Sequence, residues 1–115
     1  IGKAIEVVHL NNKKVVAGLH TYIARPVQPF ALGFCGYLMQ TFEVREQIKK
    51  LATGTSVLGI SKTNIGKVEI KLPSLEEQTK IANFLSSIDQ KIDVVSEQLE
   101  QAKLWKKGLL QQMFV

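Results

Sequence analysis

Two different spacings of apolar residues divide the chain near Pro73. Before that residue, the apolar segments are short and separated by turn residues, a pattern typical of strands and short helices. After it, apolar residues recur at alternating intervals of three and four, which is typical of a long amphipathic helix. The pattern therefore predicts two regions, a small mixed domain at 1–73 and a long heptad helix at 74–115.

The first region is predicted to contain several short strands and helices. Strands are predicted at 4–8, 15–16, 21–24, 57–60 and 68–72, where β-branched residues alternate with polar ones or stop at a turn. Helices are predicted at 30–40 and at 44–51, the second ended by Gly54, and a single helical turn is predicted at 61–65. The expected fold class is α+β: a small mixed sheet-and-helix domain followed by one long coiled-coil α-helix.

The second region begins with a helix start signal and continues as a heptad seam. Ser74 and Glu77 fit the capping box, in which a Ser N-cap is followed three residues later by Glu. The apolar residues at seam positions are Ile81, Leu85, Ile88, Ile92, Val95, Leu99, Ala102 and Leu109. A helix of about 38 residues would be about 57 Å long, too long for a small domain to cover. The seam therefore predicts pairing with a second helix in a coiled coil.

Two polar features interrupt or accompany this seam. Lys106 occupies a seam position, where a polar residue tends to fix the register or orientation of a pair. Asp89, Asp93 and Glu97 follow one another at intervals of four on one face. They form either a solvated stripe or a docking strip for a basic partner.

Charge follows the same division of the chain. The 115 residues carry a net charge of +5, and residues 1–74 hold ten basic and four acidic residues, whereas residues 75–115 hold five and six. This asymmetry suggests a domain that binds a polyanion and a separate attachment element, although an ordinary basic surface would have the same composition. The chain begins at Ile1, which predicts that it starts inside a larger protein, and its first residues do not form a signal-peptide pattern. A cytoplasmic location is the default expectation.

The sequence carries no constellation typical of catalysis. A single cysteine, Cys35, excludes a disulfide framework and a cysteine-based zinc site, and His9 and His20 lack metal-ligand spacing. No phosphate-binding loop, nucleophile elbow or metalloprotease motif is present. We therefore expect no catalytic residues, no metal and no cofactor. A small hydrolase using Cys35 is a remote alternative, since a cysteine in an apolar run usually packs as a small hydrophobic residue.

Polar turns in the first region are better suited to binding. Lysines can contact phosphates, while amides, hydroxyls and imidazoles can donate to phosphates or read base edges. The residues predicted to bind DNA are Lys13, Lys14, His20, Ser56, Lys62 and Asn64. The alternative for each is a structural turn kept in water by polar side chains.

Much of the chain resembles the DNA specificity subunit of type I restriction–modification enzymes. The most similar part runs from Val68 through Leu72-Pro73-Ser74-Leu75-Glu76-Glu77-Gln78 into the heptad helix. Further similar segments are 56–62, Lys80-Ile81-Ala82, Ile88-Asp89 and 104–111, and more weakly 16–21 and 30–54. By this resemblance, residues 1–73 are part of a target recognition domain and the helix is the distal one, with the front of that domain lying outside the chain.

The resemblance implies a non-catalytic subunit and a set of partners. Family members read double-stranded DNA, pair two long helices as an antiparallel coiled coil, and assemble with methyltransferase subunits and a restriction subunit that acts as motor and nuclease. Without its usual partner helix, this chain is expected to form a homodimer through the long helix, with no membrane contact. The alternative function is a coiled-coil oligomerisation module whose basic domain binds another acidic partner.

Overall fold

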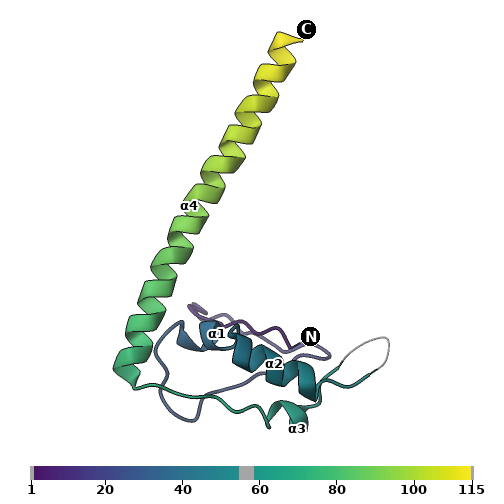
Figure 1. The fold of residues 1–115 in the computed structure, drawn as a ribbon, viewed down its shortest axis with the longest axis vertical. Coiled ribbons are helices and arrows are strands. Elements are labelled where there is room, and N and C mark those ends of the chain that lie inside the picture. Colours follow the sequence, from purple (N-terminus) through teal and green to yellow (C-terminus); the bar gives the residue numbers. More distant parts are fainter. Residues whose placement is uncertain (1, 55–58, 115) are drawn as a thin grey trace. The chain divides into compact units, whose positions relative to one another are not determined.

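The computed structural model describes residues 2–54 and 59–114, which form two compact units (Figure 1). The first unit ends at Ala82 and the second begins at Asn83. The helices in chain order are α1 (Phe34–Leu38), α2 (Phe42–Leu51), α3 (Lys62–Ile65) and α4 (Leu75–Met113). The first unit holds α1–α3 and the first turns of α4, and the second holds the rest of α4. Whether 1–73 and 74–115 act as separate domains stays a prediction.

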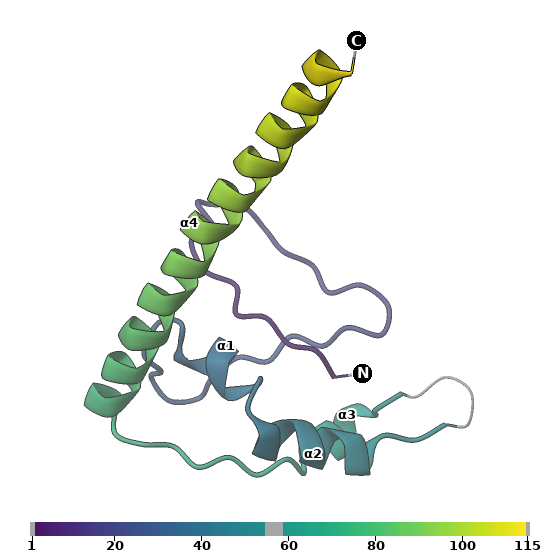
Figure 2. The ribbon, with the colours of Figure 1, turned by 45° about the horizontal axis from the view of Figure 1, so that its top comes forward.

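The predicted sheet-and-helix fold class is wrong for the described residues. The segments predicted as strands at 4–8, 15–16, 21–24 and 68–72 run as irregular chain, and the strand predicted at 57–60 begins outside the described residues (Figure 2). The β-pairing present there is an isolated antiparallel bridge between Thr53 and Gly59. A strand needs a ladder of backbone hydrogen bonds with a neighbour. In 2–30, the described backbone hydrogen bonds instead close turns, from Lys13 to Leu10 and from Thr21 to Gly18.

The exposure of the apolar side chains explains why the pattern misleads. Alternating apolar residues predict a strand because one face is expected to be buried against a core. Here Ile5 is 87% exposed and Val16 86% exposed, so the alternation has no core beneath it. The alternation identifies residues that favour a strand. A strand also requires a neighbouring strand to pair with, and the alternation gives no information about that neighbour.

The helix predicted at 44–51 is confirmed as α2, which supplies the best-buried side chains of the first unit. Val44 and Ile48 lie one turn apart on its inner face, and Ile48 is fully buried. Gly2 packs on Ile48 with a positive φ of 60°, and a Cβ added to it would lie 2.4 Å from Ile48 Cγ2. Ala52 caps the helix, two residues before the predicted stop at Gly54. The N-terminal segment is thereby held against α2.

A second small core surrounds α1. Phe34 packs with Ala31 and with Ala82 of α4. The predicted helix at 30–40 is reduced to α1, because Gly33 takes a left-handed conformation (φ 86°) just before it. The Glu6 carboxylate accepts a 2.5 Å hydrogen bond from the Gly33 N–H, so the N-terminal segment is attached here as well.

The start of α4 is anchored in the first unit by a buried amide. Gln78 Oε1 accepts from the Ala31 N–H at 3.1 Å, and Gln78 Nε2 donates to the Pro73 carbonyl at 3.0 Å. The predicted cap is confirmed at Ser74, whose Oγ accepts from the Glu77 N–H at 3.3 Å. The helix has 39 residues, about 58 Å at 1.5 Å per residue. No described residue of α4 beyond Ala82 is buried, so the coiled-coil pairing stays a prediction.

Candidate nucleic-acid interface

The C-terminal end of α2 and the short helix α3 form one connected corner of the first unit. Asn64 Nδ2 donates to the Leu51 carbonyl at 3.4 Å, which joins α3 to the last residue of α2. Thr53 and Gly59 exchange two backbone hydrogen bonds of 2.8 Å between the helices. Figures 1 and 2 both show α2 and α3 side by side. We call residues 49–54 and 59–67 of this arrangement the α2–α3 corner.

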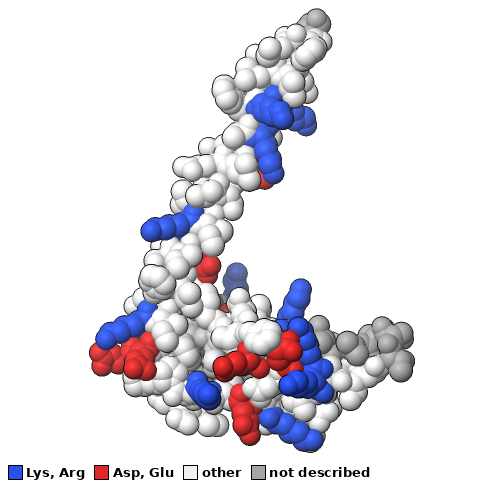
Figure 3. Space-filling model, in the orientation of Figure 1, with Lys and Arg blue, Asp and Glu red and all other residues white. Residues whose placement is uncertain are grey.

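The α2–α3 corner is locally basic. Lys49, Lys50, Lys62 and Lys67 all fall between Gln47 and Val68, and this stretch contains no acidic residue. All four side chains are exposed, and Lys49 also pairs with Glu46 at 2.9 Å. That lysine lowers the pKa of the Glu46 carboxyl, first by its hydrogen bond and then by its charge. Figure 3 shows Lys and Arg side chains gathered on one side of the first unit, with acidic groups beside them. Such a surface is suited to phosphate groups.

Two predicted DNA-binding residues lie within this corner. The helical turn predicted at 61–65 is confirmed as α3, and Ser61 caps it by accepting from the Asn64 N–H at 3.1 Å. Lys62 is exposed in its first turn. Asn64 is half-buried, and its amide nitrogen is already used by Leu51. The Lys62 side chain is therefore accessible from solvent. Asn64 uses its amide nitrogen to join α3 to α2, and its amide oxygen is left for other donors.

The remaining predicted DNA-binding residues lie elsewhere. His20 is exposed in the turn at 18–21. Tyr22, which follows this turn, reaches the corner, because its hydroxyl donates to the Ile60 carbonyl at 3.1 Å. Lys13 and Lys14 are exposed beside the turn at 10–13, which no described hydrogen bond joins to α2 or α3. Ser56 lies outside the described residues. DNA contact by any of these residues stays a prediction.

The sequence analysis missed three lysines of the corner. Lys49 and Lys50 lie together at the end of α2, whereas Lys67 follows α3 and is distant from both in sequence. A search for acid-free stretches would have found them, because no Asp or Glu occurs between 47 and 68. The polar turns alone do not indicate that the end of α2 lies beside α3.

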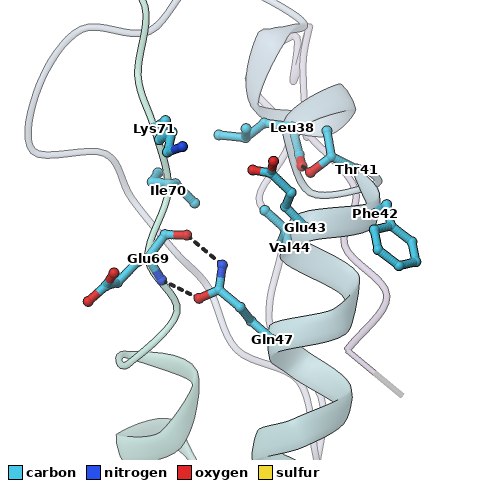
Figure 4. A pocket seen from close by; sticks show the side chains of 9 residues that line it. All are labelled: Leu38, Thr41, Phe42, Glu43, Val44, Gln47, Glu69, Ile70 and Lys71. Atoms are coloured by element: carbon cyan, nitrogen blue, oxygen red, sulfur yellow. Dashed lines mark hydrogen bonds between the residues drawn. The ribbon is translucent and has the colours of Figure 1, made fainter.

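A hollow of about 530 Å³ lies between α2 and residues 69–71, the segment that follows α3 (Figure 4). Gln47 spans it, donating to the Glu69 carbonyl and accepting from the Glu69 N–H, both at 2.8 Å. Leu38, Val44 and Ile70 are among its apolar lining residues. Both groups of the Gln47 amide bond to the Glu69 backbone, so Gln47 attaches residues 69–71 to α2. The hollow therefore presents no reactive centre.

The described residues offer no arrangement typical of catalysis or metal binding. Burial raises the pKa of the Cys35 thiol, and the nearby Glu6 carboxylate raises it further, which is unfavourable for a nucleophile. No group of three or more His, Cys, Asp or Glu side chains within 2–54 and 59–114 is placed to hold a metal ion. No helix in that part of the chain is long and apolar enough to span a membrane.

Comparison with known proteins gives a consistent result. A family model described as the type I restriction modification DNA specificity domain matches residues 4–104. The type I restriction enzyme MjaVIII specificity subunit of Methanocaldococcus jannaschii is 34% identical over 79 residues, covering 68% of this chain and 19% of that protein. The putative type I restriction enzyme MjaX specificity subunit of the same organism is 30% identical over 102 residues, covering 84% and 23%. No solved structure matches the chain significantly.

These matches confirm the resemblance described from the sequence. The chain spans about a fifth of the length of the curated relatives it matches.

Proposed function

Because the chain belongs to the type I restriction–modification DNA specificity family, we propose that it binds double-stranded DNA through the α2–α3 corner. The observation that carries this proposal is the acid-free cluster of Lys49, Lys50, Lys62 and Lys67, held together by the Asn64–Leu51 hydrogen bond. Exposed lysines contact phosphates and position a protein on DNA without reading its sequence. Ser61 belongs to the corner, and His20 lies two residues from Tyr22, whose hydroxyl donates to the Ile60 carbonyl there.

The salt dependence of binding to a 30-base-pair duplex tests this proposal, with fluorescence anisotropy as the readout. Removing one lysine that neutralises a phosphate lowers the slope of log K against log salt by about 0.9. K62A/K67A should therefore lower the slope by about 1.8. The matched control K80A/K107A removes the same charge from α4 and should change it much less. Equal effects of the two double variants would show that overall charge, and not the corner, determines binding.

We further propose that α4 pairs in a coiled coil that spaces the recognition domain and docks methyltransferase subunits. The exposed seam supports this proposal, because Ile88, Ile92, Val95 and Leu99 lie in register along one face and none is buried. Burying apolar surface contributes about 25 cal/mol per Å². In the natural assembly, a restriction subunit joins the same complex and acts on DNA in the cytoplasm. For this chain alone, the partner is a second copy of α4.

A pull-down with the methyltransferase subunit tests the role of the seam. I92K/L99K places charges on the seam and should abolish recovery of that subunit. The matched control V94K/L104K places the same charges on exposed apolar residues outside the seam and should leave recovery unchanged. Recovery that survives I92K/L99K would remove the seam from docking. If neither DNA nor methyltransferase binds while the chain self-associates, the coiled-coil module with another acidic partner is the better assignment.

A further inference from the structure

The segment 7–29 is a second acid-free part of the first unit, separate from the α2–α3 corner. It contains no Asp or Glu and carries Lys13, Lys14 and Arg25. All of its residues except Ala17 are exposed. This segment therefore offers cationic and polar side chains to the same kind of ligand as the corner does, a polyanion.

One side chain joins this segment to the corner. The Tyr22 hydroxyl donates to the Ile60 carbonyl at 3.1 Å, and the two residues are 38 positions apart in sequence. The other described hydrogen bonds of 7–29 close the turns at 10–13 and 18–21 within the segment itself. Among the described residues, the Tyr22 hydroxyl is thus the hydrogen-bonding group that attaches the turn at 18–21 to the corner.

This hydrogen bond has one polar side chain close to each of its ends. His20 lies two residues before Tyr22, and Lys62 lies two residues after Ile60. Two residues of chain span at most about 7 Å. The hydrogen bond therefore brings together two short segments, one with an exposed imidazole and the other with an exposed ammonium group.

His20 has a backbone conformation that is uncommon for a residue other than glycine. Its φ is 64°, in the left-handed region, inside a turn that is closed by a 3.2 Å hydrogen bond from the Thr21 N–H to the Gly18 carbonyl. A left-handed residue of this kind persists where its surroundings hold it. The turn hydrogen bond and the Tyr22 attachment are the described interactions that hold this one.

We propose that Tyr22 is a positioning residue for sequence recognition. By holding the turn at 18–21 against the corner, it allows His20 to bond to base edges of the duplex whose phosphates Lys62 contacts. An imidazole offers nitrogen groups that donate to or accept from base edges. The inference rests on the proposed DNA binding by the corner and adds discrimination to it, because lysines on phosphates do not distinguish sequences.

The preference for individual base pairs tests the role of His20. Selection from duplexes with a randomised centre gives the sequence that the chain prefers, and fluorescence anisotropy compares that duplex with its single-base-pair variants. H20G removes the imidazole and keeps the left-handed backbone at no steric cost. It should lower the preference about tenfold at the base pair that His20 reads, with an unchanged salt slope. A chain with no sequence preference, or an H20G chain that keeps it, would overturn the inference.

The variant Y22F tests the positioning role, because it removes only the hydroxyl. It should lower the preference at the same base pair as H20G does, and H20G/Y22F should lose no more than H20G alone, since Tyr22 acts through His20. The matched control Y37F removes a tyrosine hydroxyl from α1 and should keep the preference. Full preference in Y22F, or a double variant whose loss is the product of the two single losses, would refute the positioning role.

Two further measurements separate this role from misfolding and from the proposed function. Y22F should keep its affinity for unrelated duplexes, because the phosphate contacts remain, and should keep the hydrogen-exchange protection of α2. Loss of that protection would assign Tyr22 to the stability of the first unit and overturn the inference. An unchanged salt slope in K62A/K67A would overturn the proposed function together with this inference. A lowered slope in K62A/K67A combined with full preference in H20G would overturn this inference alone.

Discussion

The fully buried Ile48 on α2 gives the sharpest test of how the first unit is held together. Ile48→Ala removes three carbon atoms from a side chain with no exposed surface. At about 0.8 kcal/mol per buried methylene, the transfer loss is about 2.4 kcal/mol, and the cavity left behind raises the cost to about 3–4 kcal/mol. A unit of roughly 80 residues is stable by about 4–12 kcal/mol. The substitution should therefore remove a large fraction of that stability.

Hydrogen exchange measured by mass spectrometry on peptides from α2 is the appropriate assay. Circular dichroism is dominated by the 39-residue α4, so it would hide a change confined to the first unit. Phe42→Ala is the matched control, because Phe42 lies on the same helix but is 78% exposed, and it should cost no more than about 0.5 kcal/mol. Loss of protection in Ile48→Ala no larger than in Phe42→Ala would refute this account of the core.

Side chains described above support three further predictions. Gln47→Ala removes both hydrogen bonds to Glu69, should cost about 1–3 kcal/mol, and should speed exchange of the Glu69 amide; unchanged exchange there would show that the clamp is dispensable. Alkylation of Cys35 by iodoacetamide should reach its half-maximal rate at a higher pH than a free cysteine peptide, because its raised pKa keeps the thiol protonated, and a midpoint at or below the peptide's would contradict this. K13A and K14A should each weaken binding to all duplex sequences alike and lower the salt slope, whereas a sequence-selective loss would assign that lysine to base contacts.

The helices were the predictable part of this fold, because their signals are local. The spacing of Val44 and Ile48, the Ser61 cap and the Ser74 cap each act within one or two turns of chain. The helix predicted at 30–40 was too long, because Gly33 adopts a left-handed conformation and α1 begins only after it. The sheet could not be judged from sequence, because a strand exists only where another strand pairs with it.

The candidate site was predictable only in part, for a similar reason. Lys62 and Asn64 fall in one polar turn and were found, but Asn64 turned out to join α3 to Leu51. Lys50 and Lys67 are 17 positions apart in sequence, and only the contact between α2 and α3 brings their segments to one corner. The sequence shows that residues 48–67 contain no acidic residue. Only the fold shows that the lysines of two helices share one surface.

The buried Gln78 has a consequence for exchanging recognition modules between proteins of this family. A chimera joined at Pro73 would bring a foreign α4 and lack the amide that satisfies both the Ala31 N–H and the Pro73 carbonyl, together with the packing of Ala82 on Phe34. A junction placed after Ala82 keeps these interactions and transfers only exposed helix. A chimera should therefore take the start of α4 from the same protein as the domain that precedes it. The length of the remaining helix can then be chosen to set the distance between recognition domains.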